Sequence, residues 1–382
     1  MVFPPMKKKA AAAVAAGLLL CAVPLTAAAD EDDGAGRAAA PAPVPVPGVN
    51  AADERSDAAA TALMSMYDDE SGLFENNGWW TGANALTAII DNIADGGVQD
   101  HVYAIAQTYD KNIDAHDGDF TNEYLDDTGW WGLAWVKAYD LTGDTRYLDT
   151  ARADAAHMAD YWTDRCGGGV QWKTDDPYKN AVTNELYLQL NAALHNRIEG
   201  DTFYLGEAQK EWEWLQNSGM INQDNMINDG LGDDCTNNGQ PTYTYNQGIV
   251  LGGLAELHRA TGDDSLLDTA RTLADASTTS PGLHTDGILH EPGGDNTPCN
   301  SDGASFKGAY TRGLGDLDQA LDDRPYSAYL DRQATAAYDN ARNDQGFYGS
   351  DWSGPVNQTS HQCQHSALDV LNAAADGGGS GA

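Results

Sequence analysis

"TGDTRYLDTAR" occupies residues 142–152, and the chain repeats it as "TGDDSLLDTAR" at residues 261–271. Eight of the eleven positions are identical, and a weaker copy surrounds Gly200. The corresponding glycines, Gly143, Gly200 and Gly262, are 57 and 62 residues apart. A period near 60 residues is longer than one strand with its turn, so the repeat predicts helical hairpins joined by loops.

Each copy has the same order of elements. The segments before the turn, "WWGLAWVKAYDL" and "GIVLGGLAEL", are apolar on most faces, which predicts helices buried on both sides. The segment after the first turn, "YLDTARADAAHMADYW", is amphipathic. Its apolar stripe comprises Leu148, Ala151, Ala155, Met158 and Trp162. Its polar residues outside the stripe comprise Asp149, Arg152, Asp154 and Asp160. We therefore expect this helix to lie at the surface.

Buried and surface helices thus alternate along the chain. Roughly 320 residues at about 60 per hairpin give about five to six hairpins. The prediction is an all-α fold, an (α/α)6 toroid in which six inner helices are ringed by six outer ones. An open solenoid is the alternative. Inner helices that are apolar all round, and the lack of polar capping repeats, favour a closed ring.

The ends of the chain differ in composition from its middle. Three consecutive lysines precede "AAAAVAAGLLLCAVPL", so residues 1–29 are predicted to be a signal peptide and the protein to be secreted. Residues 30–52 are acidic and then rich in Pro and Ala, which is typical of a linker. A single folded domain is predicted over 53–375, and 376–382 would form a flexible tail. No later segment is apolar for long enough to span a membrane.

The formal net charge is −37. Such an acidic chain is a poor partner for nucleic acids and for anionic membranes, and we expect a solvated acidic surface. We also expect a monomer that needs no cofactor. Loops rich in Asp and Asn leave a calcium site as an alternative, but the spacing of an EF-hand is absent and no metal is predicted.

Four cysteines remain beyond the predicted signal peptide: Cys166, Cys235, Cys299 and Cys363. An even number in an exported chain favours two disulfides. Four cysteines allow three pairings, and the sequence does not choose among them. The pairing that we expect is Cys166 with Cys235 and Cys299 with Cys363. No Cys-x-x-Cys pair is present, which argues against zinc.

Two adjacent carboxylates, Asp126 and Asp127, begin the inner helix of the first repeat, within "NEYLDDTGWWGLAW" at 122–135. Helix capping is the plain explanation, since an acidic residue suits a helix N-terminus. One aspartate suffices for that role, and two adjacent ones repel. In a toroid the ends of the inner helices open on a central cavity, where two carboxyl groups meet the need of glycoside hydrolysis.

Aromatic rings are the other requirement of a sugar site, because sugar faces stack on them. Five tryptophans lie near predicted helix starts or in loops: Trp79, Trp80, Trp130, Trp131 and Trp172. Core packing is the alternative for each of them, and Trp135 and Trp162 are assigned to the core. Long loops rich in Gly, Asn and Asp, such as "RCGGGVQWKTDDPYKN" and "EPGGDNTPCNSDGASFKG", are typical of functional loops.

From about Trp79 to Asn372 the chain resembles glycoside hydrolase family 76, the endo-α-1,6-mannanases of bacteria and fungi. The matching blocks are "WWTGANALTAIIDNIA", "DDTGWWGLAWVKAYDLTGD", "CGGGVQWKTDDPYKNAVTNELYLQL", "YTYNQGIVLGGLAELHRATGD" and "FKGAYTRGL". The resemblance implies an (α/α)6 barrel that cleaves α-1,6-mannosidic bonds of mannan or its oligosaccharides with retention. It implies that Asp126 is the nucleophile and Asp127 the acid/base. The sugar contacts that it suggests are Asn84, Trp130, Trp172, Asn184, Asp229, Tyr245 and Phe306.

Three other functions stay open at this point. A transglycosidase of the cell wall would share the fold and both aspartates. A carbohydrate-binding protein without catalysis has no need of adjacent like charges, so the Asp126–Asp127 pair argues against it. Another α/α-barrel glycosidase would place its carboxylates differently.

Overall fold

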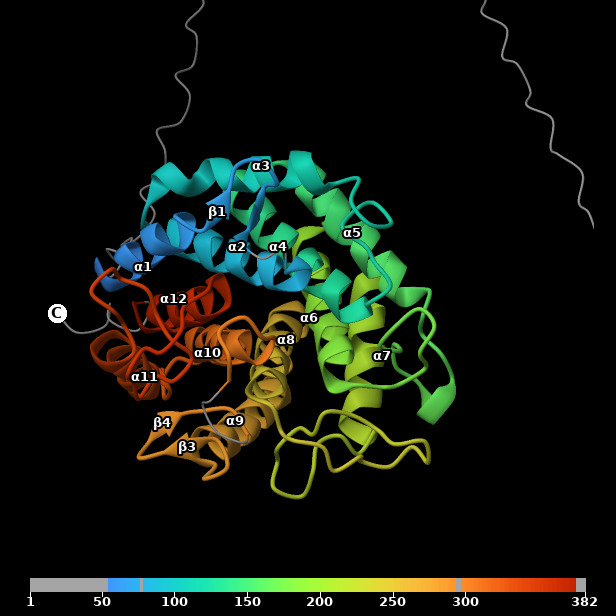
Figure 1. Cartoon of the computed structure of the whole chain (residues 1–382). Helices are drawn as coiled ribbons and strands as arrows, with labels where there is room; N and C mark the ends of the chain where they lie inside the picture. Colours follow the sequence, from blue (N-terminus) through green and yellow to red (C-terminus); the bar gives the residue numbers. More distant parts are fainter. Residues whose placement is uncertain (1–53, 76–77, 293–296, 376–382) are drawn as a thin grey trace, which may run out of the picture. The chain divides into compact units, whose positions relative to one another are not determined.

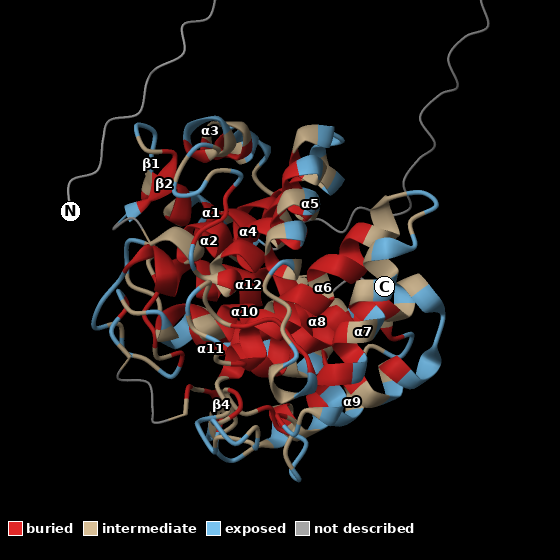
Figure 2. Cartoon of the chain, turned by 90° about the vertical axis from the view of Figure 1, so that its right-hand side faces the viewer, coloured by how far each residue is buried: buried red, intermediate tan, exposed pale blue. Residues whose placement is uncertain are grey.

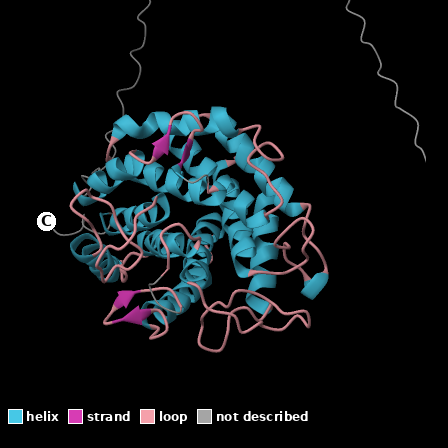
Figure 3. Ribbon diagram, in the orientation of Figure 1, coloured by secondary structure: helices cyan, strands magenta, loops and turns pink. Residues whose placement is uncertain are grey.

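The computed structural model describes residues 54–75, 78–292 and 297–375, and these residues are mostly helical (Figures 1 and 3). The predicted signal peptide, linker and tail lie outside this part of the chain, as does the first residue of the predicted domain. Within the described residues, no helix combines the length and the apolar character that crossing a membrane requires.

Six helices of the described chain form an inner ring. They are α2 (Trp79–Ala94), α4 (Leu125–Thr142), α6 (Ala181–Arg197), α8 (Thr244–Thr261), α10 (Gly303–Ala320) and α12 (His361–Ala375). Each contacts the next in this order, and α12 contacts α2, so the ring is closed. Buried residues run along these helices (Figure 2), as expected from segments that are apolar all round.

Six further helices in the same described ranges cover the outside of the ring. They are α1 (Glu54–Met64), α3 (Tyr103–Asn112), α5 (Thr145–Ala159), α7 (Phe203–Asn217), α9 (Asp264–Thr279) and α11 (Ser327–Asn340). Each packs against one or two neighbouring inner helices. The alternation of inner and outer helices confirms the predicted (α/α)6 toroid and not an open solenoid.

Short elements fill some of the connections. Strand β1 (Tyr67–Asp68) pairs antiparallel with β2 (Leu73–Phe74), and β3 (His284–Thr285) pairs antiparallel with β4 (Ile288–Leu289). Two short 3-10 helices, η2 (Gln99–Val102) and η3 (Arg165–Gly167), also lie in these connections.

The sequence repeat marks the turn between an inner and an outer helix. Helix α4 ends at Gly143 with φ 71° and α8 ends at Gly262 with φ 70°, a left-handed conformation that glycine adopts without strain. The aspartate that follows each glycine then caps the outer helix. Asp144 accepts a hydrogen bond from the backbone N–H of Arg146, and Asp263 accepts one from Ser265. The Gly-Asp pair thus ends one helix and begins the next.

The prediction that α5 has one buried apolar stripe and an exposed polar face is only partly confirmed. The apolar stripe packs inward through Ala151, Ala155 and Met158, but Asp154, predicted on the polar face, is fully buried. Helix α5 packs against both α4 and α6, so its buried face is wider than one stripe. Gly132 of α4 leaves room for Asp154: a Cβ atom added there would lie 3.2 Å from the Asp154 Cβ.

Candidate active site

A cavity of about 260 Å³ lies at the N-terminal ends of five inner helices. Its lining comprises Trp80, Asp126, Asp127, Trp130, Trp172, Tyr178, Asn180, Val182, Asp229, Tyr245, Asp302 and Phe306. These side chains come from the first two turns of α2, α4, α6, α8 and α10 and from the loops that precede them. Because all five helices point their N-termini at one place, their dipoles favour negative charge in the cavity.

Both aspartates of the pair lie in the first turn of α4, but neither is its N-cap. The N-cap is Tyr124, and it makes no capping hydrogen bond through its side chain. The Asp126 Oδ2 atom instead accepts a hydrogen bond of 3.1 Å from the Trp172 indole, and Asp126 Oδ1 accepts one of 3.1 Å from the Asp127 backbone N–H. The Asp127 Oδ2 atom accepts one of 2.8 Å from the Asn122 amide. Each carboxyl group is therefore held in place by a donor of its own.

The two carboxyl groups differ in acidity. Burial raises the pKa of Asp126 to about 6, against the hydrogen bonds from Asp127 and Trp172, which lower it. Burial also raises the pKa of Asp127 well above its usual range, and the charge of Asp126 raises it further. Near neutral pH the two carboxyl groups therefore share a proton, and the hydrogen bonds from Trp172 and the Asp127 backbone favour the anion at Asp126.

Aromatic rings form the walls of the cavity. Trp80 stacks on Trp130 with ring centroids 5.8 Å apart, and the centroids of Tyr245 and Phe306 are 4.0 Å apart. Trp172 completes the wall on the side of Asp126, where its indole N–H is bonded. Flat apolar faces beside carboxyl groups are suited to a sugar, whose ring carries both C–H faces and hydroxyls.

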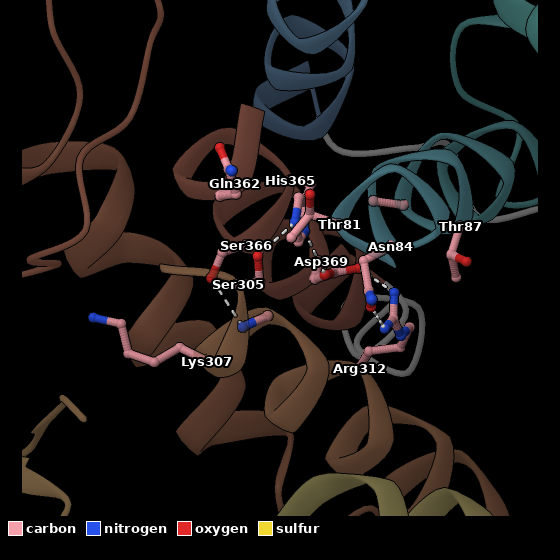
Figure 4. Close-up of polar contacts among 12 residues, drawn as sticks. Thr81, Asn84, Thr87, Ser305, Lys307, Arg312, Gln362, His365, Ser366 and Asp369 are labelled. Atoms are coloured by element: carbon pink, nitrogen blue, oxygen red, sulfur yellow. Dashed lines mark hydrogen bonds and ion pairs between the residues drawn. The ribbon is translucent and has the colours of Figure 1, made fainter. Parts of the chain in front are cut away.

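Two of the expected sugar contacts, Asn84 and Asn184, are not among the side chains that line this cavity. Asn84 is buried and accepts a hydrogen bond from Arg312 (Figure 4). It also donates one of 3.2 Å to the Trp80 carbonyl. Asn184 is also buried and exchanges two hydrogen bonds, of 2.7 and 3.0 Å, with the backbone of Val170. Both asparagines thus hold elements that lie next to the cavity.

The other five expected contacts do line it: Trp130, Trp172, Asp229, Tyr245 and Phe306. Of the remaining tryptophans that were candidates, Trp80 lines the cavity, whereas Trp131 is fully buried and Trp79 stacks against Phe120.

Sequence reasoning missed four lining residues, Tyr178, Asn180, Val182 and Asp302. Tyr178 and Asn180 lie in the loop "RCGGGVQWKTDDPYKN", and Asp302 lies in "EPGGDNTPCNSDGASFKG". The Asn and Asp content of these loops was the signal that could have pointed to them. Tyr178 donates a hydrogen bond to Asp229 and accepts one of 2.7 Å from Asn238, which fixes the Asp229 carboxylate in the wall.

Disulfides hold the loops around the cavity. Cys166 is bonded to Cys235 and Cys299 to Cys363, so the expected pairing is confirmed. The second bond ties the loop before α10 to helix α12, three residues before the cavity residue Asp302. Trp162, expected in the core, is only partly buried and packs against it.

The sequence comparisons agree on one family. The sequence profile of glycosyl hydrolase family 76 matches residues 51–376. A putative mannan endo-1,6-alpha-mannosidase of Schizosaccharomyces pombe is 30% identical over 300 residues, which cover 72% of this chain and 67% of that protein. The mannan endo-1,6-alpha-mannosidase DCW1 of Saccharomyces cerevisiae is 29% identical over 299 residues, which cover 72% and 66%. The chain thus spans about two thirds of the length of these curated relatives.

Solved structures of the family have the same fold. The GH76A alpha-1,6-mannanase from Salegentibacter sp. HEL1_6 superposes with a TM-score of 0.76 and 25% identity, covering 84% of this chain and 98% of that one. Dfg5 from Chaetomium thermophilum, solved in complex with glucosamine, superposes with a TM-score of 0.74 and 21% identity, covering 85% and 90%. With a profile that matches most of its length and the same ring of helices, the chain belongs to glycosyl hydrolase family 76.

Proposed function

We propose that this protein is a secreted, endo-acting enzyme that hydrolyses α-1,6-mannosidic linkages in mannan and retains the anomeric configuration. The observation that carries the proposal is the buried Asp126–Asp127 pair, whose two carboxyl groups are held by different hydrogen-bond donors at one aromatic-walled cavity. The linkage is supported by the relatives, which are named mannan endo-1,6-alpha-mannosidases. An inactive variant of the Salegentibacter enzyme, in which two consecutive aspartates are replaced by alanine, is described in complex with alpha-1,6-mannotetrose.

In the proposed first step, the ionised Asp126 carboxylate attacks the anomeric carbon. The bond to the leaving sugar breaks as Asp127 gives its proton to the departing oxygen. The Trp172 indole and the N-terminal turn of α4 keep Asp126 anionic. In the second step, water attacks the anomeric carbon while Asp127 takes a proton from that water, and the ester bond to Asp126 breaks, which restores both groups. The two inversions leave the product with the configuration of the substrate.

The walls of the cavity supply the binding. We assign sugar contacts to Trp130, Trp172, Asp229, Tyr245 and Phe306, which all line it. Asn84 and Asn184, which the family resemblance suggests as contacts, would act by holding Trp80 and Val170. Secretion rests on the sequence of residues 1–29 alone, and the monomeric state is likewise a proposal that light scattering on the mature chain would test.

The test is hydrolysis of a linear α-1,6-manno-oligosaccharide, followed by mass spectrometry of the products and by NMR of the newly formed anomer. Asp126→Asn and Asp127→Asn should each lower kcat by about 10²–10⁴-fold while circular dichroism shows the native fold. Asp331→Asn on α11, where the side chain is exposed, is the matched control and should keep most of the activity. Azide should rescue Asp127→Ala on a substrate with a good leaving group and give a glycosyl azide of retained configuration.

Three results would contradict the proposal. They are an inverted first product, near-normal activity in either asparagine variant, and no cleavage of an α-1,6-linked chain. Products longer than the supplied oligosaccharide would instead indicate transfer to a second sugar, the activity of a transglycosidase.

A further inference from the structure

We propose that the cavity selects uncharged mannan over mannan that carries phosphate, and that Asp302 is the residue that sets this selectivity. The inference rests on the proposed function, because it names the class of mannan that this site accepts. It follows from the distribution of charge around the cavity, which the mechanism above does not use.

The side chains of the lining are acidic and include no cation, so only the partial positive charges of the helix N-termini offset their negative charge. Four carboxyl groups face the cavity, those of Asp126, Asp127, Asp229 and Asp302, and none of the described lining residues is Lys, Arg or His. The mechanism needs two of these groups, and Asp229 is bonded to Tyr178. Asp302 is therefore the lining carboxylate that has no role in the proposed mechanism.

Two cationic side chains lie near the cavity, but each lies beside an aromatic ring of its wall and is paired with a carboxylate outside the lining. The Arg312 guanidinium lies 5.9 Å from the centre of the Trp130 ring and is bonded to Asp369 at 3.2 Å and to Asn84, as Figure 4 shows for the polar partners. The Lys173 ammonium lies 6.0 Å from the Trp172 ring and 3.3 Å from Glu123. Their positive charge is thus directed at carboxylates outside the lining and not at a bound sugar.

Asp302 lies at the exposed rim of the cavity, where a hydrogen bond holds its side chain in place. It occupies the N-cap position of α10 yet makes no capping hydrogen bond, and its Oδ1 atom instead accepts one of 3.1 Å from the Trp80 indole. Its field reaches the reacting groups, because its charge raises the pKa of both Asp126 and Asp127. Low-dielectric walls focus such a field into the cavity.

A phosphate group on the substrate would enter this field with a charge of about −1.5 to −2 at pH 7. At about 10 mM salt the Debye length is about 30 Å, so the repulsion acts wherever in the cavity the phosphate lies. A neutral mannosyl chain meets no such repulsion. The geometry therefore favours phosphate-free stretches of mannan.

The experiment compares three α-1,6-mannotrioses that differ only at C6 of the non-reducing sugar, which carries a hydroxyl, an amine or a phosphate. Their Kd values are measured by calorimetry at about 10 mM and about 1 M NaCl. At low salt we expect the amine to bind most tightly and the phosphate at least about tenfold more weakly than the hydroxyl. At high salt the three values should converge.

Asp302→Asn keeps an acceptor for the Trp80 indole and removes the charge, and it should shrink the phosphate-to-hydroxyl ratio at least about threefold. The control is Asp331→Asn on α11, an exposed position with the same change of charge, which should leave the ratio as it is. An unchanged ratio in Asp302→Asn overturns the inference, as does equal binding of phosphate and hydroxyl. Weakening by amine and phosphate alike would mean that size and not charge decides, which also overturns it.

The outcome is separable from that of the proposed function. If the series binds in the expected order but longer neutral chains are not cleaved, the inference holds and the hydrolase proposal fails. If the neutral triose does not bind at all, both fail.

Discussion

Two neighbouring aspartates of identical chemistry acquire different properties because their donors differ. Asp126 is bonded to an indole N–H and a backbone N–H, whereas Asp127 is bonded to one amide and feels the charge of Asp126. Burial raises both pKa values, and these differences separate them. The proposed assignment of nucleophile and acid thus depends in part on Trp172, a residue that is distant from the pair in the sequence.

Trp172→Phe tests this dependence. The substitution keeps a ring in the wall but removes the hydrogen bond that lowers the pKa of Asp126. The pKa of Asp126 should therefore rise above about 6, and the acidic limb of the pH profile of kcat/KM should move to higher pH. The measurement is a pH–rate series on an α-1,6-manno-oligosaccharide.

Trp212→Phe on the outer helix α7 is the control for losing an indole, and its acidic limb should coincide with that of the wild type. An acidic limb that stays in place in Trp172→Phe would show that the indole does not stabilise the anion.

The sequence revealed the aspartate pair because its two members are adjacent and an apolar run follows them. It did not single out Tyr178 or Asp302, because the Asn- and Asp-rich composition of their loops indicates a functional loop but not which of its residues line a cavity. Asn84 and Asn184 show the opposite limit. The family resemblance suggests sugar contact, but both side chains are buried against the backbone of their neighbours.

At the scale of single elements, α5 contains a carboxyl group that its pattern assigned to solvent. Asp154 is fully buried, and neither of its oxygens has a hydrogen-bond partner. Burial raises its pKa well above the usual range, so the folded state holds it protonated over pH values where the unfolded chain ionises it. Its contribution to stability is complete below the ordinary pKa of aspartate and is lost as pH rises through the folded pKa.

Asp154→Asn should remove this loss. In the window between the two pKa values, the wild type loses about 1.4 kcal/mol of unfolding free energy per pH unit from this group. The variant should therefore be more stable than the wild type at pH 7 and lose that advantage near pH 4. Urea denaturation at both pH values measures the difference.

Asp149→Asn on the exposed side of the same helix serves as the reference and should change little at either pH. A variant no more stable than the wild type at pH 7 would mean that Asp154 is satisfied in its buried position.

The turn that precedes α5 was predictable because Gly143 and Asp144 act locally. The burial of Asp154 could not be predicted, because it depends on the packing of α5 against α4 and α6.

At the scale of the whole molecule, the ring could be predicted because the repeat and its apolar helices leave few other arrangements. The acidic composition has a consequence at the same scale. With a formal net charge of −37, repulsion among carboxylates opposes compaction, and counterions screen it. The melting temperature should therefore rise as NaCl increases from about 10 mM to about 200 mM.

Differential scanning calorimetry at pH 7 follows this rise. The range below about 0.2 M is the informative one, because the effect of salt on apolar burial is small there and that of screening is large. A melting temperature that stays level or falls over this range would show that the acidic residues are spaced widely enough not to repel.

The closed ring also constrains the order in which the chain becomes an enzyme. Helix α12 meets α2 through the hydrogen bond between His361 and Thr81, and through that from Asn372 to the Ala88 carbonyl, which join residues 280 and 284 positions apart. These contacts form only after nearly the whole chain has left the ribosome. Until then Trp80 on α2 and Asp302 before α10 have no fixed distance between them. Activity should therefore arise in a single late step, when α12 closes the ring. This helix contributes no residue to the lining of the cavity, but its docking fixes the positions of the helices that do.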